Sequence, residues 1–314
     1  MSTLLGHFVL AAPLFATVLV GYLIARLPFW RPAWTQWLSK VVFAGIVPAM
    51  LFRMMSDLSA LPAVDPRLLL AFFGGCFIVF VLGRLLAATV FKLDGVAQSI
   101  FGLGGVFSNN VMLGLPLAKA TLGPASMPSV ALVLVFNSLT LWTLVSVSVE
   151  WARHGEFSVR GFARTAFGVL TNPVVASILG GTLYGLAGFH LPGPVATGLS
   201  AVGQLAGPAA LLALGMGLVE YGVGAGWQQS VAITALKLVA QPVVVWVLAA
   251  LLHLPPMESK VVVLLASMSV GVNVYLMAVQ FKSMQGPVAG SLVLSTALAA
   301  LTTPILLALL SALT

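Results

Sequence analysis

Long apolar segments divide this chain, and they constrain its fold more than any other feature of the sequence. Of its 314 residues, 60% are hydrophobic and 7% are charged, and the mean hydropathy is +1.12. A helix needs about 20 mostly apolar residues to cross roughly 30 Å of hydrocarbon. The sequence therefore predicts an all-α membrane protein with ten transmembrane helices. Their expected bounds are 7–26, 34–55, 68–91, 96–122, 128–150, 171–188, 199–220, 229–252, 260–281 and 287–312.

Lysines and arginines are unequally shared between the two sides of these predicted helices. One side carries Arg26, Arg31, Lys40, Arg84, Lys92, Arg153, Arg160, Arg164 and Lys282. The other side carries Arg53, Arg67, Lys119 and Lys260. Loops rich in Lys and Arg remain in the cytoplasm. We therefore expect the first set to be cytoplasmic and both termini to lie on the extracytoplasmic side of a bacterial inner membrane.

The two halves of the chain resemble each other. PLFATVLVGYL at 13–23 aligns with PVVASILGGTL at 173–183, and the same shift places Pro48 on Pro208. Such self-similarity predicts repeated structural units, here two repeats of five helices each. Because five is odd, the second repeat enters the membrane from the opposite side. This inverted arrangement is typical of secondary transporters. The expected repeats are 1–160 and 161–314.

The fourth predicted helix of each half is interrupted by small and polar residues. The interruptions are FGLGGVFSNNVMLGLP at 101–116 and LLASMSVGVNVYLMA at 264–278. Non-helical backbone at membrane depth is tolerated only where it is buried in protein or lines a wet cavity. We expect these two helices to break and to cross near the membrane midplane, with Gly105 and Gly271 permitting the backbone angles. The side chains then available to a ligand are Ser108, Asn109, Asn110, Ser269 and Asn273.

The expected breaks favour an anionic substrate. Half-helices that begin at the midplane present the positive ends of their dipoles there. No Asp or Glu lies near the centre of a predicted transmembrane helix, and the nearest are Glu150 and Glu220 at cytoplasmic ends. The sequence therefore argues against a cation pump that relies on a central carboxylate.

Four motifs of this sequence resemble the auxin efflux carrier family, which includes plant PIN auxin transporters and bacterial carriers of malonate-like acids. NNVMLGLPL at 109–117 and SVGVNVYLMAVQF at 269–281 resemble the two crossing segments of that family. TNPVVASILG at 171–180 resembles the opening of its sixth helix, and LTLWTLVSVSVEWAR at 139–153 the end of its fifth. The resemblance covers nearly the whole chain, in order.

The resemblance implies how the helices divide and assemble. It implies a scaffold formed by residues 7–55 and 171–220, and a mobile transport group formed by residues 68–150 and 229–312. It also implies a substrate site where the interrupted helices cross, and a homodimer. Plant members carry a long cytoplasmic loop that this chain lacks, so its phosphorylation control is not expected here.

The resemblance also assigns individual residues. Asn109 matches the asparagine that contacts substrate in plant members, and Asn137 falls where those members carry a glutamine near the site. The chain departs from the plant pattern at Ser108 and Ser269, where plant members have prolines. Serine hydroxyls at these positions offer direct partners to a carboxylate or an ion.

Two further residues are candidate ligand contacts with an alternative role. Lys237 lies inside the eighth predicted helix, where it either helps to hold an anion or forms a structural pair. Tyr275 is either a contact or an ordinary packed aromatic residue. Hydrogen bonding between helices is likewise an alternative role for the asparagines. The residues expected to shape the helices, as breaks or kinks, are Gly105, Pro116, Gly271, Pro48 and Pro208.

Enzymatic chemistry finds little support in the sequence. The histidines His7, His154, His190 and His253 are scattered without the spacing of a metal site, and Cys76 is a single cysteine. The net charge of +7 is not gathered into a basic patch with interleaved aromatic residues, so nucleic acid is not an expected partner. We expect neither a metal nor another cofactor.

The function that the sequence favours is secondary active transport of a small organic anion, malonate or a similar carboxylate, by alternating access. The coupling ion, H⁺ or Na⁺, is left open. Auxin-like aromatic acids or amino acids are the alternative substrates. A channel or a membrane sensor is the alternative class of protein, because crossed broken helices also line pores.

Overall fold

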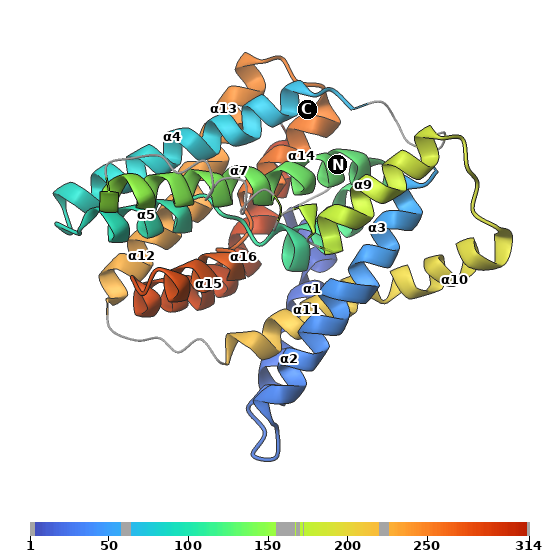
Figure 1. Ribbon diagram of the computed structural model, residues 1–314, viewed down its shortest axis with the longest axis horizontal. Coiled ribbons are helices and arrows are strands. Elements are labelled where there is room, and N and C mark those ends of the chain that lie inside the picture. The colour runs from blue at the N-terminus through green and yellow to red at the C-terminus, as the bar shows by residue number, and fades with distance from the viewer. Residues whose placement is uncertain are drawn as a thin grey trace.

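The computed structural model describes residues 4–57, 64–154, 167, 170–171, 173–219 and 226–312. Within these ranges the chain is all-helical, apart from turns and loops (Figure 1). The α-helices are α1 (Leu4–Ala25), α2 (Pro32–Val41), α3 (Val47–Met55), α4 (Arg67–Thr89), α5 (Gly95–Gly104), α6 (Leu115–Leu122), α7 (Met127–His154), α9 (Pro173–Leu186), α10 (Gly193–Gln204), α11 (Ala206–Leu218), α12 (Trp227–Ala235), α13 (Gln241–Leu251), α14 (Pro256–Ala266), α15 (Val272–Gln280) and α16 (Gln285–Ala312). Short helical turns lie between some of them, namely η1 (Val42–Ile46), η3 (Asn110–Gly114), η4 (Pro124–Ser126) and η5 (Leu236–Ala240).

Six stretches of helix in the described residues are long and apolar enough to cross a membrane, by length and composition. They match six of the ten predicted transmembrane helices: Pro32–Met55, Arg67–Thr89, Pro124–Arg153, Gly193–Leu218, Trp227–Leu251 and Gln285–Leu310. Two shorter apolar stretches, Ala11–Ala25 and Pro173–Leu186, match the first and sixth. The fourth and ninth predicted helices each consist of two shorter pieces, α5 with η3–α6, and α14 with α15. The all-helical fold is thus confirmed, while the total of ten transmembrane helices stays a prediction.

Two helices begin four or more residues earlier than the apolar pattern predicts. The helical stretch expected from 199 begins at Gly193, and the one expected from 260 begins at Pro256. Both have a proline in their first turn. Proline has the φ angle of a helix and lacks the N–H that would have no partner there, so it starts a helix well. The expected bounds miss these first turns, because Gly and Pro at the start of α10 and the charged residues at the start of α14 resemble a loop.

Three of the helical stretches contain a π-helical turn, and in each case a proline lies two residues after the turn ends. Pro48, Pro116 and Pro242 are the second residues of the helices that come after η1, η3 and η5. A proline ring clashes with the carbonyl four residues earlier and offers no hydrogen bond to it. Widening the preceding turn to the π form relieves that clash. Two of the predicted kinks, at Pro48 and Pro116, therefore coincide with local changes of helix pitch.

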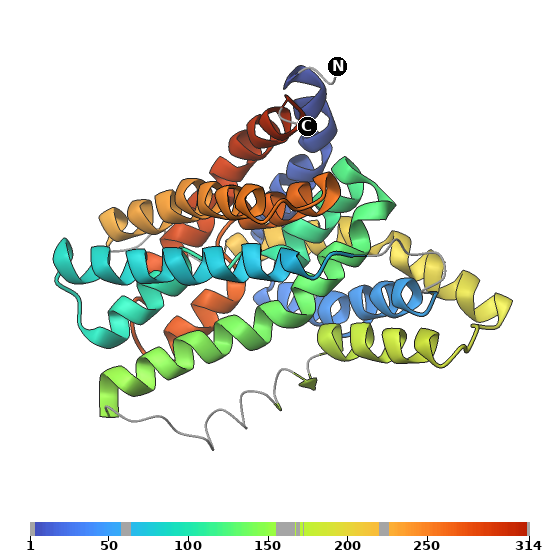
Figure 2. The same cartoon turned by 90° about the horizontal axis from the view of Figure 1, so that it is seen from above.

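Figures 1 and 2 show the helices in two groups that lie side by side. Helices α4, α5, α12 and α15 lie on one side of the molecule, and α2, α3, α9 and α10 lie on the other. Across the second group, α1 packs on α11 and α3 packs on α9 and α10. In the first group, α4 packs on α5 and α13, and α12 packs on α16. The start of α1 and the end of α16 lie close together in both views.

Helices α1 and α11 pack with their backbones in direct contact, because glycines face each other across the pair. A Cβ atom added at Gly215 would lie 1.9 Å from the carbonyl oxygen of Val18. One added at Gly21 would lie 2.3 Å from the carbonyl oxygen of Leu212. Membrane helices approach this closely only where small residues line the interface. The two glycines therefore fix the distance between the first and seventh predicted transmembrane helices.

Gly215→Ala should destabilise the protein strongly, because the added methyl group forces α1 and α11 apart. We expect a loss of at least about 3 kcal/mol, the upper end of the range for overpacked cores. The measurement is the thermal unfolding midpoint and the yield of monodisperse protein in detergent. Gly198→Ala on α10 is the matched control, because no atom lies within 4 Å of a Cβ built there. Equal stability of the two variants would contradict the close packing of α1 and α11.

Candidate functional site

Two short non-helical segments lie side by side in the interior of the molecule. We call residues 105–109, between α5 and η3, linker 1, and residues 267–271, between α14 and α15, linker 2. Ser108 and Val270 form an isolated antiparallel bridge between the linkers. The backbone N–H of Asn109 donates to the Ser269 carbonyl at 2.8 Å, and that of Gly271 donates to the Phe107 carbonyl at 2.7 Å. Each linker therefore supplies hydrogen-bond partners that a continuous helix would have supplied.

The close approach of the linkers depends on Gly271. A Cβ atom at this position would lie 3.1 Å from both the Phe107 ring and the Ser108 carbonyl oxygen. These contacts are tighter than ordinary van der Waals packing, so a side chain here would push the linkers apart. The N–H of Val270 donates to Ser295 Oγ at 2.9 Å. The backbone N–H groups of Asn109, Val270 and Gly271 are thus paired inside the protein, as apolar surroundings require.

Side chains of the eighth predicted transmembrane helix bind the carbonyl ends of both interrupted helices. Gln241 Nε2 donates to the Val106 carbonyl in linker 1 at 2.9 Å. The ammonium of Lys237, which is fully buried, donates to the Ala266 carbonyl at the end of α14. Carbonyls at a helix C-terminus have no partner within the helix and carry its partial negative charge. The position of Lys237 therefore favours the structural pairing, the second of its two predicted roles.

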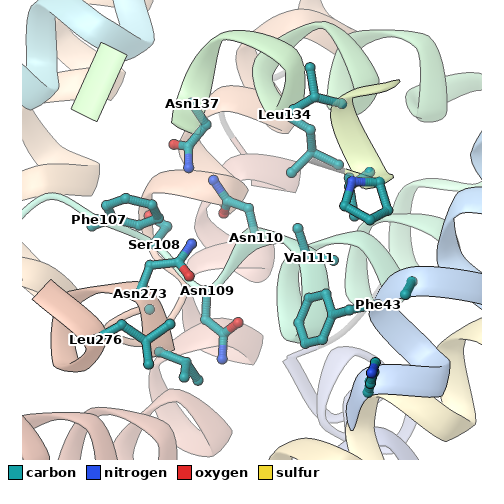
Figure 3. Close-up of a pocket in the computed structure, with 17 residues that line it drawn as sticks. Phe43, Phe107, Ser108, Asn109, Asn110, Val111, Leu134, Asn137, Asn273 and Leu276 are labelled. Carbon is teal, nitrogen blue, oxygen red and sulfur yellow. The ribbon is translucent and has the colours of Figure 1, made fainter. Parts of the chain in front are cut away.

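A cavity of about 330 Å³ lies where the linkers face the other group of helices. Its walls come from both linkers and the helical turns after them, from α7, from the α2–η1 junction and from the start of α9. Figure 3 shows Asn137 of α7 and Asn110 pointing toward each other, Asn273 beside Ser108, and Phe43 on the opposite side. The predicted residues that line it are Ser108, Asn109, Asn110, Asn137, Gly271 and Asn273.

Several polar atoms at this cavity are buried and have no hydrogen-bond partner among the described residues. They are Ser108 Oγ, Asn109 Nδ2, both amide atoms of Asn110, and Asn137 Oδ1. The three asparagines are only 2–6% exposed. A buried polar group without a partner costs about 1–3 kcal/mol, and such groups in native proteins usually have a water or ligand partner. Their concentration around one cavity indicates a place where a polar ligand binds.

The electrostatics of the cavity favour an anion. The π-helical turn η3 and helix α15 both begin at its wall. The N–H groups of Asn110 and Val274 donate to linker carbonyls, while the other N–H groups of these first turns have no carbonyl partner within the helix. A helix N-terminus carries a partial positive charge. Lys40 is the one cationic side chain, and there is no acidic one, among the described residues that line it. A carboxylate would meet amide donors, helix N-termini and an ammonium group here.

Three predicted ligand contacts lie outside the cavity wall. Besides Lys237, these are Ser269 and Tyr275. The Ser269 hydroxyl is fully buried with no partner among the described residues, while its carbonyl holds the N–H of Asn109. Tyr275 lies on α15 and packs against the apolar core. A role for these residues in binding stays a prediction.

The remaining predicted shape-setting residues lie next to changes in backbone direction. Gly105 follows the last residue of α5, and its N–H donates to carbonyls in that helix. Pro208 lies in the first turn of α11, after α10 has ended at Gln204 and the chain has turned at Leu205. These positions agree with kinks and breaks, and none of the three predicted prolines, Pro48, Pro116 and Pro208, lines the cavity wall.

The sequence analysis missed one wall of the cavity. Lys40, Phe43 and Ala44 line it from the α2–η1 junction, and residues 173–175 line it from the start of α9. The spacing of i, i+3 and i+4 places the first three on one helix face, which is the available signal in the sequence. The sequence assigns Lys40 only to the cytoplasmic set of cations that indicates membrane topology.

Many apolar helices that meet around a buried polar cavity are typical of membrane transport proteins. Over residues 7–158 and 164–307 the sequence matches the membrane transport protein family, which is the auxin efflux carrier family, and the chain belongs to it. The predicted resemblance is therefore confirmed. The chain is a multi-pass membrane protein that transports a substrate, and it is not an enzyme.

A protein of Rhizobium meliloti (strain 1021) is similar over almost its full length. Its name is "Putative malonate transporter". The two sequences are 25% identical over 300 residues, which cover 93% of this chain and 92% of the relative.

Proposed function

We propose that this protein is a secondary active carrier of a small organic anion, malonate or a similar carboxylate. The observation that carries the proposal is the set of buried, unpartnered amide groups on Asn109, Asn110 and Asn137 around one cavity. Amide N–H groups and helix N-termini can replace the water around a carboxylate. The similar protein named as a malonate transporter supports this choice of substrate.

The carrier works by alternating access. The site lies at the seam between the two groups of helices, where one wall comes from the linkers and α7 and the other from α2, η1 and α9. We assign α1–α3 and α9–α11 to the scaffold, and the remaining helices to the transport group. Movement of the transport group along the scaffold carries the linkers and their ligand across the membrane.

The helix pairing supports an inverted repeat. Helix α1 packs on α11, and α3 packs on α9, which pairs the first predicted transmembrane helix with the seventh and the second with the sixth. Exchanging the two halves, 1–160 and 161–314, converts each of these pairs into the other. The paired linkers, one from each half, lie where such a two-fold axis would pass. The helix breaks are therefore interpreted as equivalent features of two related halves.

Lys40 supplies the positive charge of the site. It belongs to the scaffold side of the cavity, opposite the asparagines of the transport group. A dicarboxylate can place one carboxylate at the amides and helix N-termini and the other at this ammonium. Charge-assisted hydrogen bonds of this kind are about twice as strong as neutral ones. The combination predicts a preference for malonate over an acid with one carboxylate.

Purified protein in liposomes should take up radiolabelled malonate, with a rate that saturates and with exchange of labelled for unlabelled substrate. Gradients of H⁺, Na⁺ or electrical potential are then imposed one at a time. The gradient that accelerates uptake identifies the coupling ion. Flux that never saturates would indicate a channel, and binding without flux a sensor. Uptake of an aromatic acid or an amino acid in place of malonate would overturn the choice of substrate.

A further inference from the structure

A second cavity, of about 550 Å³, lies along the same seam between the two groups of helices. Its walls come from α3 and α10 on the scaffold side, and from α6, η4 and the start of α7 on the transport side. It shares no lining residue with the cavity at the linkers. Lys40 and Arg53, which line the first and the second cavity, are 13 residues apart, or about 20 Å along a helix. The first cavity therefore lies at the middle of the helical stretch Pro32–Met55, and the second lies at its C-terminal end.

The second cavity is also positively charged. Arg53 and Lys119 line it, and no Asp or Glu does so among the described residues. The only ion pair of Arg53 among those residues is with Asp57, at 3.9 Å, and the Asp57 side chain is 43% exposed. Exposed pairs at such distances contribute little. Because the buried Nε of Arg53 has no partner among the described residues, its guanidinium retains donors for an anion.

We propose that the second cavity is a separate binding site for a small carboxylate, anchored by Arg53 with help from Lys119. A guanidinium can bind a carboxylate through two parallel hydrogen bonds. Ser200 and Gln204 of α10 add neutral polar groups to the wall. The proposal rests on the proposed function, because it gives the transported anion a second binding position toward one end of the path. Lys40 and Arg53 then hold the anion at two successive positions along its route.

The site can be tested by protecting an introduced cysteine. The native Cys76 is the only cysteine, so Cys76→Ala provides a background in which Ser200→Cys reports from the cavity wall. Malonate should slow the reaction of that thiol with N-ethylmaleimide. Only the empty fraction reacts, so the rate falls about tenfold when malonate is at ten times its dissociation constant. Thr197→Cys, one turn earlier on α10 and outside the cavity wall, should react equally fast with and without malonate.

Substitutions separate local binding from a change of conformation at a distance. The malonate concentration that gives half-maximal protection should rise at least about tenfold in Arg53→Gln and less in Arg53→Lys. Protection should persist in Asn109→Ala, which disables only the cavity at the linkers. Lys260→Gln, a cation outside both cavity walls, should leave protection unchanged. Each rate is compared with and without malonate in the same variant, because a nearby cation also alters thiol reactivity.

The labelling requires binding only, so it decides the question even if the intact protein transports no malonate. Protection that disappears in Asn109→Ala and survives in Arg53→Gln would overturn the proposal, because it would report a conformational change driven from the first cavity. Absence of protection at every malonate concentration would overturn it as well. A failure of malonate uptake alone removes the proposed substrate and leaves this site standing.

Discussion

Asn109→Ala should lower kcat/KM for malonate uptake by about 10- to 100-fold, because a hydrogen bond to a charged group contributes about 1.5–3 kcal/mol. The Nδ2 donor of Asn109 has no partner among the described residues and lies at the cavity wall. The substitution leaves the backbone unchanged, so the N–H of residue 109 still donates to the Ser269 carbonyl. The pairing of the linkers should therefore survive while ligand binding is lost.

The measurement is initial uptake into liposomes that contain equal amounts of folded protein. Gln280→Ala is the matched control, because it removes an exposed amide at the end of α15 that lies outside the cavity wall. Asn109→Asp should be at least as damaging, since a carboxylate at this position repels an anionic substrate. Normal kinetics of folded Asn109→Ala would mean that the substrate binds elsewhere.

The helical architecture followed from the sequence because bilayer thickness sets a length that an apolar segment must match. Helix beginnings were harder to predict. The first turns of α10 and α14 contain proline and lie outside the apolar stretches, so hydrophobicity alone does not detect them. The π-helical turn before Pro242 was also not predicted, although its cause, the clash of the proline ring with the preceding turn, is readable in the sequence.

The transport-group side of the site was predictable, since polar residues in an apolar segment are costly unless they have a use. Ser108, Asn109, Asn110 and Asn273 stood out for that reason, and all four line the cavity. The scaffold side carries weaker signals. Residues 173–175 are a proline and two valines, which are typical of any membrane helix. Lys40 lies near a helix end, where lysine also marks the cytoplasmic side of a membrane.

Lys237 shows why position in a helix does not determine a role. A cation inside a membrane helix is a functional candidate by default, and its depth could be calculated from the sequence. Its partner could not be predicted, because the Ala266 carbonyl belongs to another helix. That carbonyl is available as an acceptor only because α14 ends there. Recognising the structural role required the place where α14 stops and the packing of α14 against the eighth predicted helix.

Lys40→Gln should raise KM for malonate about tenfold and change kcat less than about twofold, since the lost contact is a charge-assisted hydrogen bond formed in the bound state. Lys40→Arg should retain most of the affinity, while Lys40→Glu should abolish uptake by placing like charges together.

The monoamide of malonate, which keeps one carboxylate, tests what Lys40 contacts. Its inhibition constant, measured by competition with malonate uptake, should be almost unchanged in Lys40→Gln. Arg31→Gln is the matched control, because it removes a cation at the start of α2 outside the cavity wall. If malonate and its monoamide lost affinity equally in Lys40→Gln, Lys40 would act on the total charge of the site and would not hold the second carboxylate.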